Sequence, residues 1–97
     1  MPWNNPIPYV FGFFSVMDNA PAESGIYAIY NGESYIYIGE AADIRAKLIN
    51  HLNGDYPCIM SRNPRSFSFE LCPSGRRFRR LTEMIRELTP PCNIRLY

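Results

Sequence analysis

Residues 25–39 read GIYAIYNGESYIYIG, and this stretch decides the fold. β-Branched and aromatic residues fill both halves, and Asn31-Gly32 lies between them, a pair typical of β-hairpin turns. The stretch therefore predicts two antiparallel strands joined by a tight turn. Each strand has a tyrosine in a short block with an isoleucine and a glycine, Tyr27 in the first strand and Tyr37 in the second.

The register of this hairpin decides whether Tyr27 and Tyr37 meet. Side chains alternate between the two faces of a strand, so the two tyrosines share a face only if the loop has an odd length or a bulge intervenes. A three-residue loop, 31–33, predicts that they lie directly opposite each other, whereas a two- or four-residue loop separates them. The pair fits either a tyrosine-rich hairpin core or two phenols placed for proton transfer at a phosphodiester.

The residues after the hairpin predict a helix. Asp43 is typical of an N-cap and Gly54 of a glycine that closes a helix, so we expect a helix over about 43–53. Apolar residues recur at every fourth position and form its buried stripe: Ile44, Leu48 and Leu52. Lys47 and His51 are also four apart, so both project from one neighbouring face.

A strand and a second helix follow. Residues 66–72 alternate in polarity and predict a strand with Phe67, Phe69 and Leu71 turned inward. We expect a helix over about 75–88, capped by Ser74 and ended by Pro90-Pro91, with 92–97 as an extended tail. Its core-facing residues are expected to be Phe78, Leu81, Ile85 and Leu88.

The chain is expected to form one small α+β domain over residues 1–97. A three-stranded, mixed or antiparallel sheet, made of the hairpin and strand 66–72, is flanked by the two helices. Residues 23–94 form the core, and 1–22 are an apolar N-terminal extension in which 9–14 form an edge strand or pack on the sheet. No apolar run approaches the roughly 18 residues of a membrane span, and the start lacks the pattern of a secretory signal.

Three cysteines, Cys58, Cys72 and Cys92, are an odd number, widely spaced and without a C-x-x-C pair. This pattern predicts reduced, mostly buried thiols in a cytoplasmic protein, in preference to disulfides or a zinc site.

The net charge of +1 conceals an asymmetry. Residues 1–61 hold six acidic residues against two basic ones, a balance of −4, and residues 62–97 hold eight arginines against three glutamates, a balance of +5. Nine of the ten basic residues are arginine, whose planar fork pairs bidentately with phosphate. The basic half fits either a nucleic-acid-binding face or a solvated arginine-rich helix.

Together these residues resemble the GIY-YIG endonuclease family. The resemblance covers about residues 23–94 and depends on five features in a fixed order. They are Gly25-Ile26-Tyr27, Tyr37-Ile38-Gly39, a helix with a basic residue and a histidine, a second helix with Glu83, and a Pro-Pro-x-Asn segment ending at Asn93.

The resemblance implies hydrolysis of DNA phosphodiester bonds with one divalent metal, Mg²⁺ or Mn²⁺, held mainly by Glu83. It implies that Tyr27 is the general base or orients the attacking water, and that Tyr37 is its hydrogen-bonded partner. His51 is implied as a proton shuttle or as the group that activates a tyrosine. A phenol of pKa about 10 is a poor base at pH 7 unless a neighbour or a metal shifts it.

Other residues are expected near the substrate. Gly39 would let backbone or substrate approach the second strand, and Asn93 would pack or clamp the backbone near the site. Arg76 and Arg79, with their arginine neighbours, crowd a helix N-terminus, where the helix dipole disfavours cations. That crowding favours an anion such as DNA phosphate there, although a solvated helix start is the simpler explanation.

Lys47 is where the chain departs from the family, which usually places an arginine at this position. Lysine neutralises phosphate as a point charge but lacks the bidentate fork. Arg45, the other cation of this helix expected at the substrate, lies roughly 200° around the helix. One hypothesis is a metal-dependent DNA endonuclease weakened at Lys47. The alternative is a catalytically weak or inactive module that binds nucleic acid or a protein through its arginine-rich face. In either case a separate protein partner would supply targeting.

Overall fold

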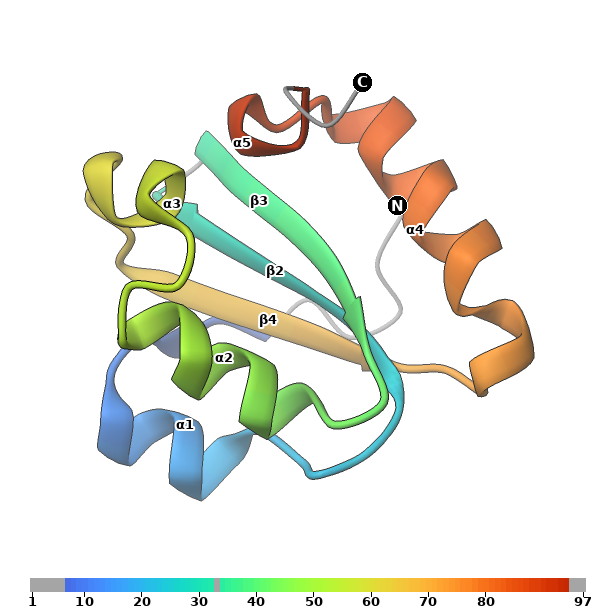
Figure 1. The fold of residues 1–97 in the computed structure, drawn as a ribbon, viewed down its shortest axis with the longest axis horizontal. Coiled ribbons are helices and arrows are strands. Elements are labelled where there is room, and N and C mark those ends of the chain that lie inside the picture. The colour runs from blue at the N-terminus through green and yellow to red at the C-terminus, as the bar shows by residue number, and fades with distance from the viewer. Residues whose placement is uncertain (1–6, 33, 95–97) are drawn as a thin grey trace.

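The computed structural model describes residues 7–32 and 34–94. In chain order its elements are β1 (Tyr9–Val10), α1 (Phe13–Asn19), β2 (Gly25–Asn31), β3 (Ser34–Ala41), α2 (Ile44–Leu52), α3 (Pro57–Ser61), β4 (Ser66–Leu71), α4 (Ser74–Leu88) and α5 (Pro91–Ile94). The strands form one antiparallel sheet in the order β1-β4-β2-β3 (Figure 1). The predicted α+β class is confirmed. No helix in the described ranges is long and apolar enough to cross a membrane.

Within the described ranges the sheet has four strands where three were predicted. Tyr9 and Val10 pair with Phe67 and Ser66, so the N-terminal segment adds an edge strand next to β4. The other outer edge is β3, which pairs only with β2 among the described strands. Proline-rich sequence around β1 made an edge strand one of two expectations, and the pairing decides between them.

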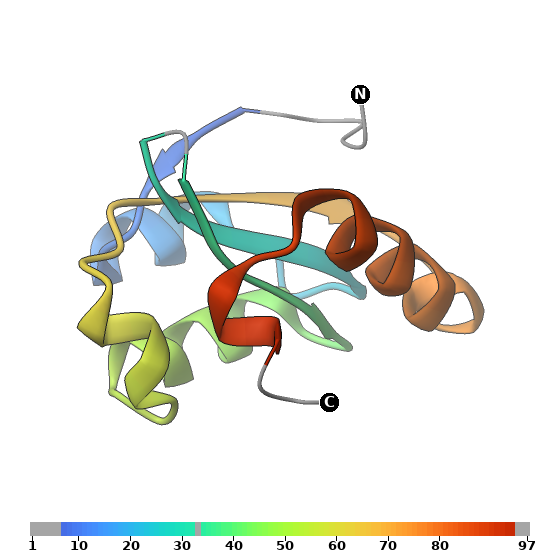
Figure 2. The ribbon, with the colours of Figure 1, turned by 90° about the horizontal axis from the view of Figure 1, so that it is seen from above.

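Helices cover both faces of the sheet. On one face Tyr27, Ile29 and Phe67 pack in a cluster with residues of α1, α2 and α3. On the other face Ile26 and Ala28 pack against α4. Figures 1 and 2 accordingly place α4 on the far side of the β2–β3 hairpin from α1, α2 and α3. Burial on both faces explains why β2 is a nearly continuous apolar run.

Three short elements were missed. α1 lies in the N-terminal extension, and α3 lies between the predicted helix 43–53 and strand 66–72, where no helix was predicted. α5 takes up residues 92–94 of the predicted extended tail. Each helix is brief, and α1 has no side-chain cap that a sequence pattern could reveal. Pro57 at the start of α3 is a helix-start signal that was available. The rest of the predicted tail, 95–97, lies outside the described residues.

The predicted inward faces need correction in β4 and α4. In β4 Leu71 is 52% exposed, whereas Ser68 and Glu70 are buried, because α4 covers the face that was expected to meet water. In α4 Phe78 is 74% exposed and Met84 is fully buried. Phe78 lies six residues before Met84, about 120° away around the helix, so it misses the buried stripe.

The predicted caps are half right. The Asp43 carboxylate accepts a hydrogen bond from the Ala46 amide, which confirms Asp43 as the N-cap of α2. In α4 the N-cap is Pro73, and Ser74 is already the first helical residue.

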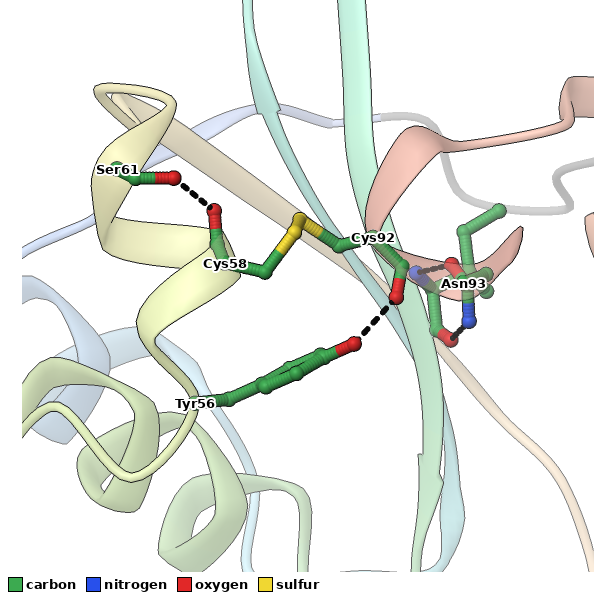
Figure 3. The surroundings of a disulfide bond; sticks show 6 residues. Tyr56, Cys58, Ser61, Cys92 and Asn93 are labelled. Carbon is green, nitrogen blue, oxygen red and sulfur yellow. Dashed lines mark hydrogen bonds between the residues drawn. A yellow bond between two sulfur atoms is a disulfide. The ribbon is translucent and has the colours of Figure 1, made fainter. Parts of the chain in front are cut away.

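The expectation of reduced thiols is wrong for Cys58 and Cys92. A disulfide joins them and ties α3 to α5, with the Tyr56 hydroxyl donating to the Cys92 carbonyl beside it (Figure 3). The two cysteines are 34 residues apart in the sequence, so their spacing gave no sign that α5 folds back onto α3. Cys72 is a buried free thiol, as predicted.

Candidate active site

Tyr27 and Tyr37 lie on the same face of the hairpin, although not by the loop that was predicted. Asn31 pairs with Ser34, so the three-residue loop is wrong, and a bulge between β2 and β3 restores the shared face. Tyr27 is paired with Gly39 and Tyr37 with Ile29, so the two tyrosines are diagonal neighbours. Their ring centroids are 6.2 Å apart.

Gly39 provides the space in which the Tyr27 phenol lies. A Cβ built on Gly39 would overlap the hydroxyl and ring atoms of Tyr27. Gly39 was predicted to admit backbone or substrate, but here Tyr27 takes that space. The phenol thus passes over β3 toward the edge of the sheet.

His51 receives this phenol. Its Nε2 lies 2.7 Å from the Tyr27 hydroxyl, and its Nδ1 lies 2.7 Å from a carboxylate oxygen of Asp55. An ionised carboxylate only accepts, so Nδ1 carries the proton, and Nε2 accepts from the Tyr27 O–H. His51 also contacts the Tyr37 ring edge-on, at 5.5 Å between ring centroids. The structure therefore brings together Tyr27, Tyr37 and His51 and adds Asp55.

Burial sets the protonation of this cluster. It raises the pKa of Tyr27 well above its ordinary value, and the neighbouring Tyr37 raises it further. Burial, with a smaller contribution from the charge of Lys47, lowers the pKa of His51 against the opposing effect of Asp55. Near neutral pH both Tyr27 and His51 are uncharged, so Tyr27 can give up its proton only as another group supplies one.

Two cations of α2 have different surroundings. The Arg45 Nε donates to the Ala20 carbonyl at 2.9 Å, so this side chain joins α2 to the end of α1. Lys47 is exposed, and its charge contributes to lowering the pKa of His51 one turn later. Of these two predicted site cations, Lys47 is the one that lies beside His51 with its side chain in solvent.

Asn93 closes the outer edge of β3. Its side-chain oxygen accepts from the Ile38 amide at 2.7 Å, and its side-chain nitrogen donates to the Ile38 carbonyl at 2.8 Å. Because Asn93 is 1% exposed and its amide is occupied by backbone, it clamps the strand and has no free polar atom for substrate. Asn93 was predicted either to pack or to clamp the backbone near the site, and its two hydrogen bonds to Ile38 correspond to the clamp.

Tyr56 is a neighbour of the cluster that the sequence did not reveal. Its ring meets that of Tyr37 edge-on, with centroids 5.5 Å apart. Its hydroxyl donates to the Cys92 carbonyl (Figure 3), so the Tyr37 ring is supported from the disulfide side.

Glu83 lies away from the tyrosines. Its carboxylate accepts from Arg80 at 3.2 Å, and Arg80 also forms a bidentate pair with Glu70 of β4. Glu70 is paired with Ile26, whose side chain meets α4, whereas the next residue, Tyr27, faces α2. Glu83 therefore belongs to a helix that packs on the opposite face of the sheet from the tyrosine cluster.

The residues at the tyrosine cluster do not fit a magnesium ion held by protein groups. Its carboxylate, Asp55, is bonded to His51, and an ion at Glu83 would lie across the sheet. Across residues 7–32 and 34–94 no three His, Cys, Asp or Glu side chains gather as a metal site. The assignment of the metal to Glu83 stays a prediction.

Arg76 and Arg79 are both exposed in the first half of α4. Their neighbours Arg77 and Arg80 are held by Glu40 and Glu70, respectively. Because Arg77 and Arg80 are held in these ion pairs, Arg76 and Arg79 are the arginines in this half of α4 that are directed to solvent.

Solved structures with a similar fold come from Thermotoga maritima. The GIY-YIG N-terminal endonuclease domain of UvrC, described as bound to its catalytic divalent cation, magnesium, superposes with a TM-score of 0.72. The superposition covers 82% of this chain and 93% of that domain at 20% identity. The chain has the GIY-YIG fold. A tyrosine-to-phenylalanine variant of the same domain gives a TM-score of 0.71 at 19% identity, with the same two shares covered.

Curated relatives match this chain over a shorter segment. UvrABC system protein C from Fervidobacterium nodosum is 40% identical over 38 residues, and that from Hydrogenobaculum sp. is 42% identical over 38. Each match covers 39% of this chain and 7% of the relative, so the chain spans a small fraction of those proteins. No protein-family model matches the chain.

Proposed function

We propose that this GIY-YIG domain is a metal-dependent endonuclease that hydrolyses phosphodiester bonds of DNA. The observation that carries the proposal is the hydrogen-bonded contact of Tyr27 with His51, beside Tyr37, on a fold that a magnesium-bound endonuclease domain shares. Paired phenols next to an imidazole suit proton transfer during attack of water on a phosphodiester.

In this proposal the tyrosines and His51 transfer protons, and the cations bind phosphate. Tyr37, which is partly exposed, orients the attacking water, and the buried Tyr27 passes a proton to His51. Lys47 neutralises phosphate charge as it develops. Arg76 and Arg79 bind flanking phosphates through their exposed guanidinium groups.

A divalent cation, Mg²⁺ or Mn²⁺, is part of the proposal because the Thermotoga domain is described with its catalytic magnesium. Magnesium keeps several waters and uses one or two carboxylates together with substrate phosphates. We assign no step to a cation held at the tyrosines, because the residues there do not fit one. The prediction that Glu83 is its ligand is tested separately below.

Cleavage assays with purified protein test the proposal on branched, nicked and linear DNA, with Mg²⁺, with Mn²⁺ and with chelator. We expect cation-dependent nicking that Tyr27→Phe and Tyr37→Phe each reduce by about 10²-fold or more. Tyr35→Phe is the matched control, because Tyr35 lies on the same strand and packs on the opposite face. Absence of cutting by the wild type, or equal cutting by Tyr27→Phe, would overturn the proposal.

A second candidate is a nucleic-acid-binding module with weak or lost chemistry. Two observations favour it: Lys47 takes the place of the family arginine, and Glu83 lies across the sheet from the tyrosines. Salt-dependent DNA binding without cation-dependent cutting would support it. Binding should weaken in an Arg76→Ala/Arg79→Ala variant, whereas Glu83→Ala should leave binding and any cutting unchanged if this carboxylate is remote. A loss of cutting in Glu83→Ala would instead restore it as a metal ligand.

A further inference from the structure

We propose that Asp55 is a positioning residue of the site: it holds His51 in the ring orientation and tautomer that let Nε2 take the proton of Tyr27. The inference deepens the proposed nuclease function and depends on it for its catalytic meaning. The orientation of His51 by Asp55 does not depend on that function, because two contacts of 2.7 Å join Asp55 to His51 and His51 to Tyr27.

The local fold explains how Asp55 comes to lie under His51. The chain leaves α2 through Gly54, whose φ of +85° is in the left-handed region that glycine tolerates. The Gly54 amide donates to the His51 carbonyl, and the Asp55 amide donates to the Asn50 carbonyl. This is the hydrogen-bond pattern of a Schellman motif, which turns the chain back on the helix. It places the Asp55 carboxylate beside Nδ1 of His51.

The donor count then fixes the tautomer. Asp55 as a carboxylate has acceptors only, so the short contact requires a proton on Nδ1 of His51. Nε2 is left with a lone pair directed at Tyr27. Without Asp55 the ring can carry its proton on either nitrogen, and with the proton on Nε2 it cannot accept from Tyr27.

The groups that face His51 come from several elements. Tyr27 lies on β2, Tyr37 on β3, Lys47 one turn back on α2, and Asp55 on the turn after α2. Asp55 is the acid among these four, so it balances the imidazolium that forms when His51 takes a proton. Its side chain is 42% exposed, which lets water solvate the carboxylate between turnovers.

The proton transfer balances in a simple way. Water loses a proton to the phenol pair as its oxygen bonds to phosphorus, and the Tyr27 proton moves to Nε2 of His51. The bond from phosphorus to the leaving oxygen breaks, and that oxygen takes a proton from solvent. His51 returns its extra proton to solvent by way of the phenols, so one water is consumed for each bond cleaved.

Two readouts test Asp55: the nitrogen-15 NMR signals of the His51 imidazole, and the pH profile of DNA cleavage. His51 is the single histidine of the chain, so its signals are unambiguous. In the wild type we expect the tautomer with the proton on Nδ1. In Asp55→Asn, whose amide can donate to Nδ1, we expect a shift toward the other tautomer. Cleavage should fall by about 10- to 100-fold, as is typical when a group that orients a functional histidine is removed.

Two further variants complete the design. Asp55→Glu keeps a carboxylate and should restore most of the Nδ1 tautomer and part of the rate. Asp18→Asn makes the same change of charge on exposed α1 and should leave both readouts as in the wild type. Thermal unfolding of each variant checks that it is folded.

The outcomes separate this inference from the proposed function. An Asp55→Asn variant with the wild-type tautomer and pH profile would overturn the positioning role even if the wild type cuts DNA. If the wild type cuts no DNA, the proposed function fails, and the NMR comparison still decides whether Asp55 sets the state of His51. A changed tautomer together with a low-pH limb of the rate profile moved to lower pH supports the inference, because Asp55 raises the pKa of His51.

Discussion

The phenol of Tyr27 occupies the volume that a side chain on Gly39 would need. The two residues are directly paired across β2 and β3, so the glycine of the second motif makes room for the tyrosine of the first. Tyr27 is only 1% exposed and its hydroxyl is bonded to His51, so the ring cannot swing away without breaking that contact.

Replacing Gly39 by alanine should therefore damage both stability and the site. We expect the free energy of unfolding to fall by about 1–3 kcal/mol, as for other overpacked cores. Displacement of Tyr27 should also weaken its hydrogen bond to His51 and reduce DNA cleavage. Denaturant unfolding measures the first effect and the cleavage assay the second.

Gly75→Ala is the matched control for this change. Gly75 lies in the first turn of α4, where a Cβ would meet no described residue apart from its own neighbours in the helix. Alanine there should be neutral or stabilise by about 0.5–1 kcal/mol, because it favours the helix. Equal stability of Gly39→Ala and the wild type would show that the Tyr27 ring is not confined as described.

Asn93→Ala should destabilise the edge of the sheet. The change leaves the amide and carbonyl of Ile38 buried without their partner, which costs about 2–4 kcal/mol for the two groups together. Amide hydrogen exchange at Ile38 should accelerate along with the loss of stability. Asn50→Ala, on an exposed position of α2, serves as control, and a similar small effect of both changes would contradict the clamp.

Sequence periodicity was sufficient to locate the hairpin, α2, β4 and α4, because each has a clear apolar pattern, although it misplaced the buried faces of β4 and α4. It could not reveal the bulge that aligns Tyr27 with Tyr37. The bulge leaves no mark beyond one extra residue near Ile36, and the odd loop that was expected instead would have produced the same shared face. The prediction that Tyr27 and Tyr37 share a face was thus right, but the cause is a bulge and not the predicted three-residue loop.

Some site residues could likewise be found from the sequence, whereas the direction of others could not. His51 was assigned through the resemblance to the GIY-YIG family, whereas Asp55 could have been found from helical spacing, since it lies four residues after His51. Glu83 was assigned by its position in a motif, and its direction depends on the angle around α4, which is fixed by the ion pair of Arg80 with Glu70. Such a tertiary contact cannot be derived from the order of residues along one helix.

Reduction of the Cys58–Cys92 disulfide should lower stability by about 3–4 kcal/mol. The estimate follows from the loop entropy released when a link spanning 34 residues is opened. The Cys58→Ser/Cys92→Ser variant should show the same loss and no further response to reductant. Thiol titration of the unfolded wild type should give one free thiol before reduction and three after it, and three beforehand would contradict the disulfide.

The low pKa of His51 makes stability depend on pH. Burial holds its pKa below that of the unfolded chain, so the native state binds fewer protons than the unfolded state. The contribution of His51 is therefore complete above about pH 6.5 and is lost as the pH falls through its folded value. Thermal melts between pH 8 and pH 5 should show a steeper decline for the wild type than for His51→Gln. Parallel profiles would rule out His51 as the source.

Lys47→Arg decides between a weakened nuclease and a module without chemistry. Lys47 is exposed on the same helix as His51, so arginine there gains a planar fork for phosphate without displacing a buried group. If the remaining site is competent, cleavage should rise by about tenfold or more, and Lys47→Ala should lower it. Lys47→Arg/Tyr27→Phe is the control, since any gain that depends on the phenol must vanish in it. An unchanged rate in Lys47→Arg, together with intact salt-dependent binding, would favour the binding module.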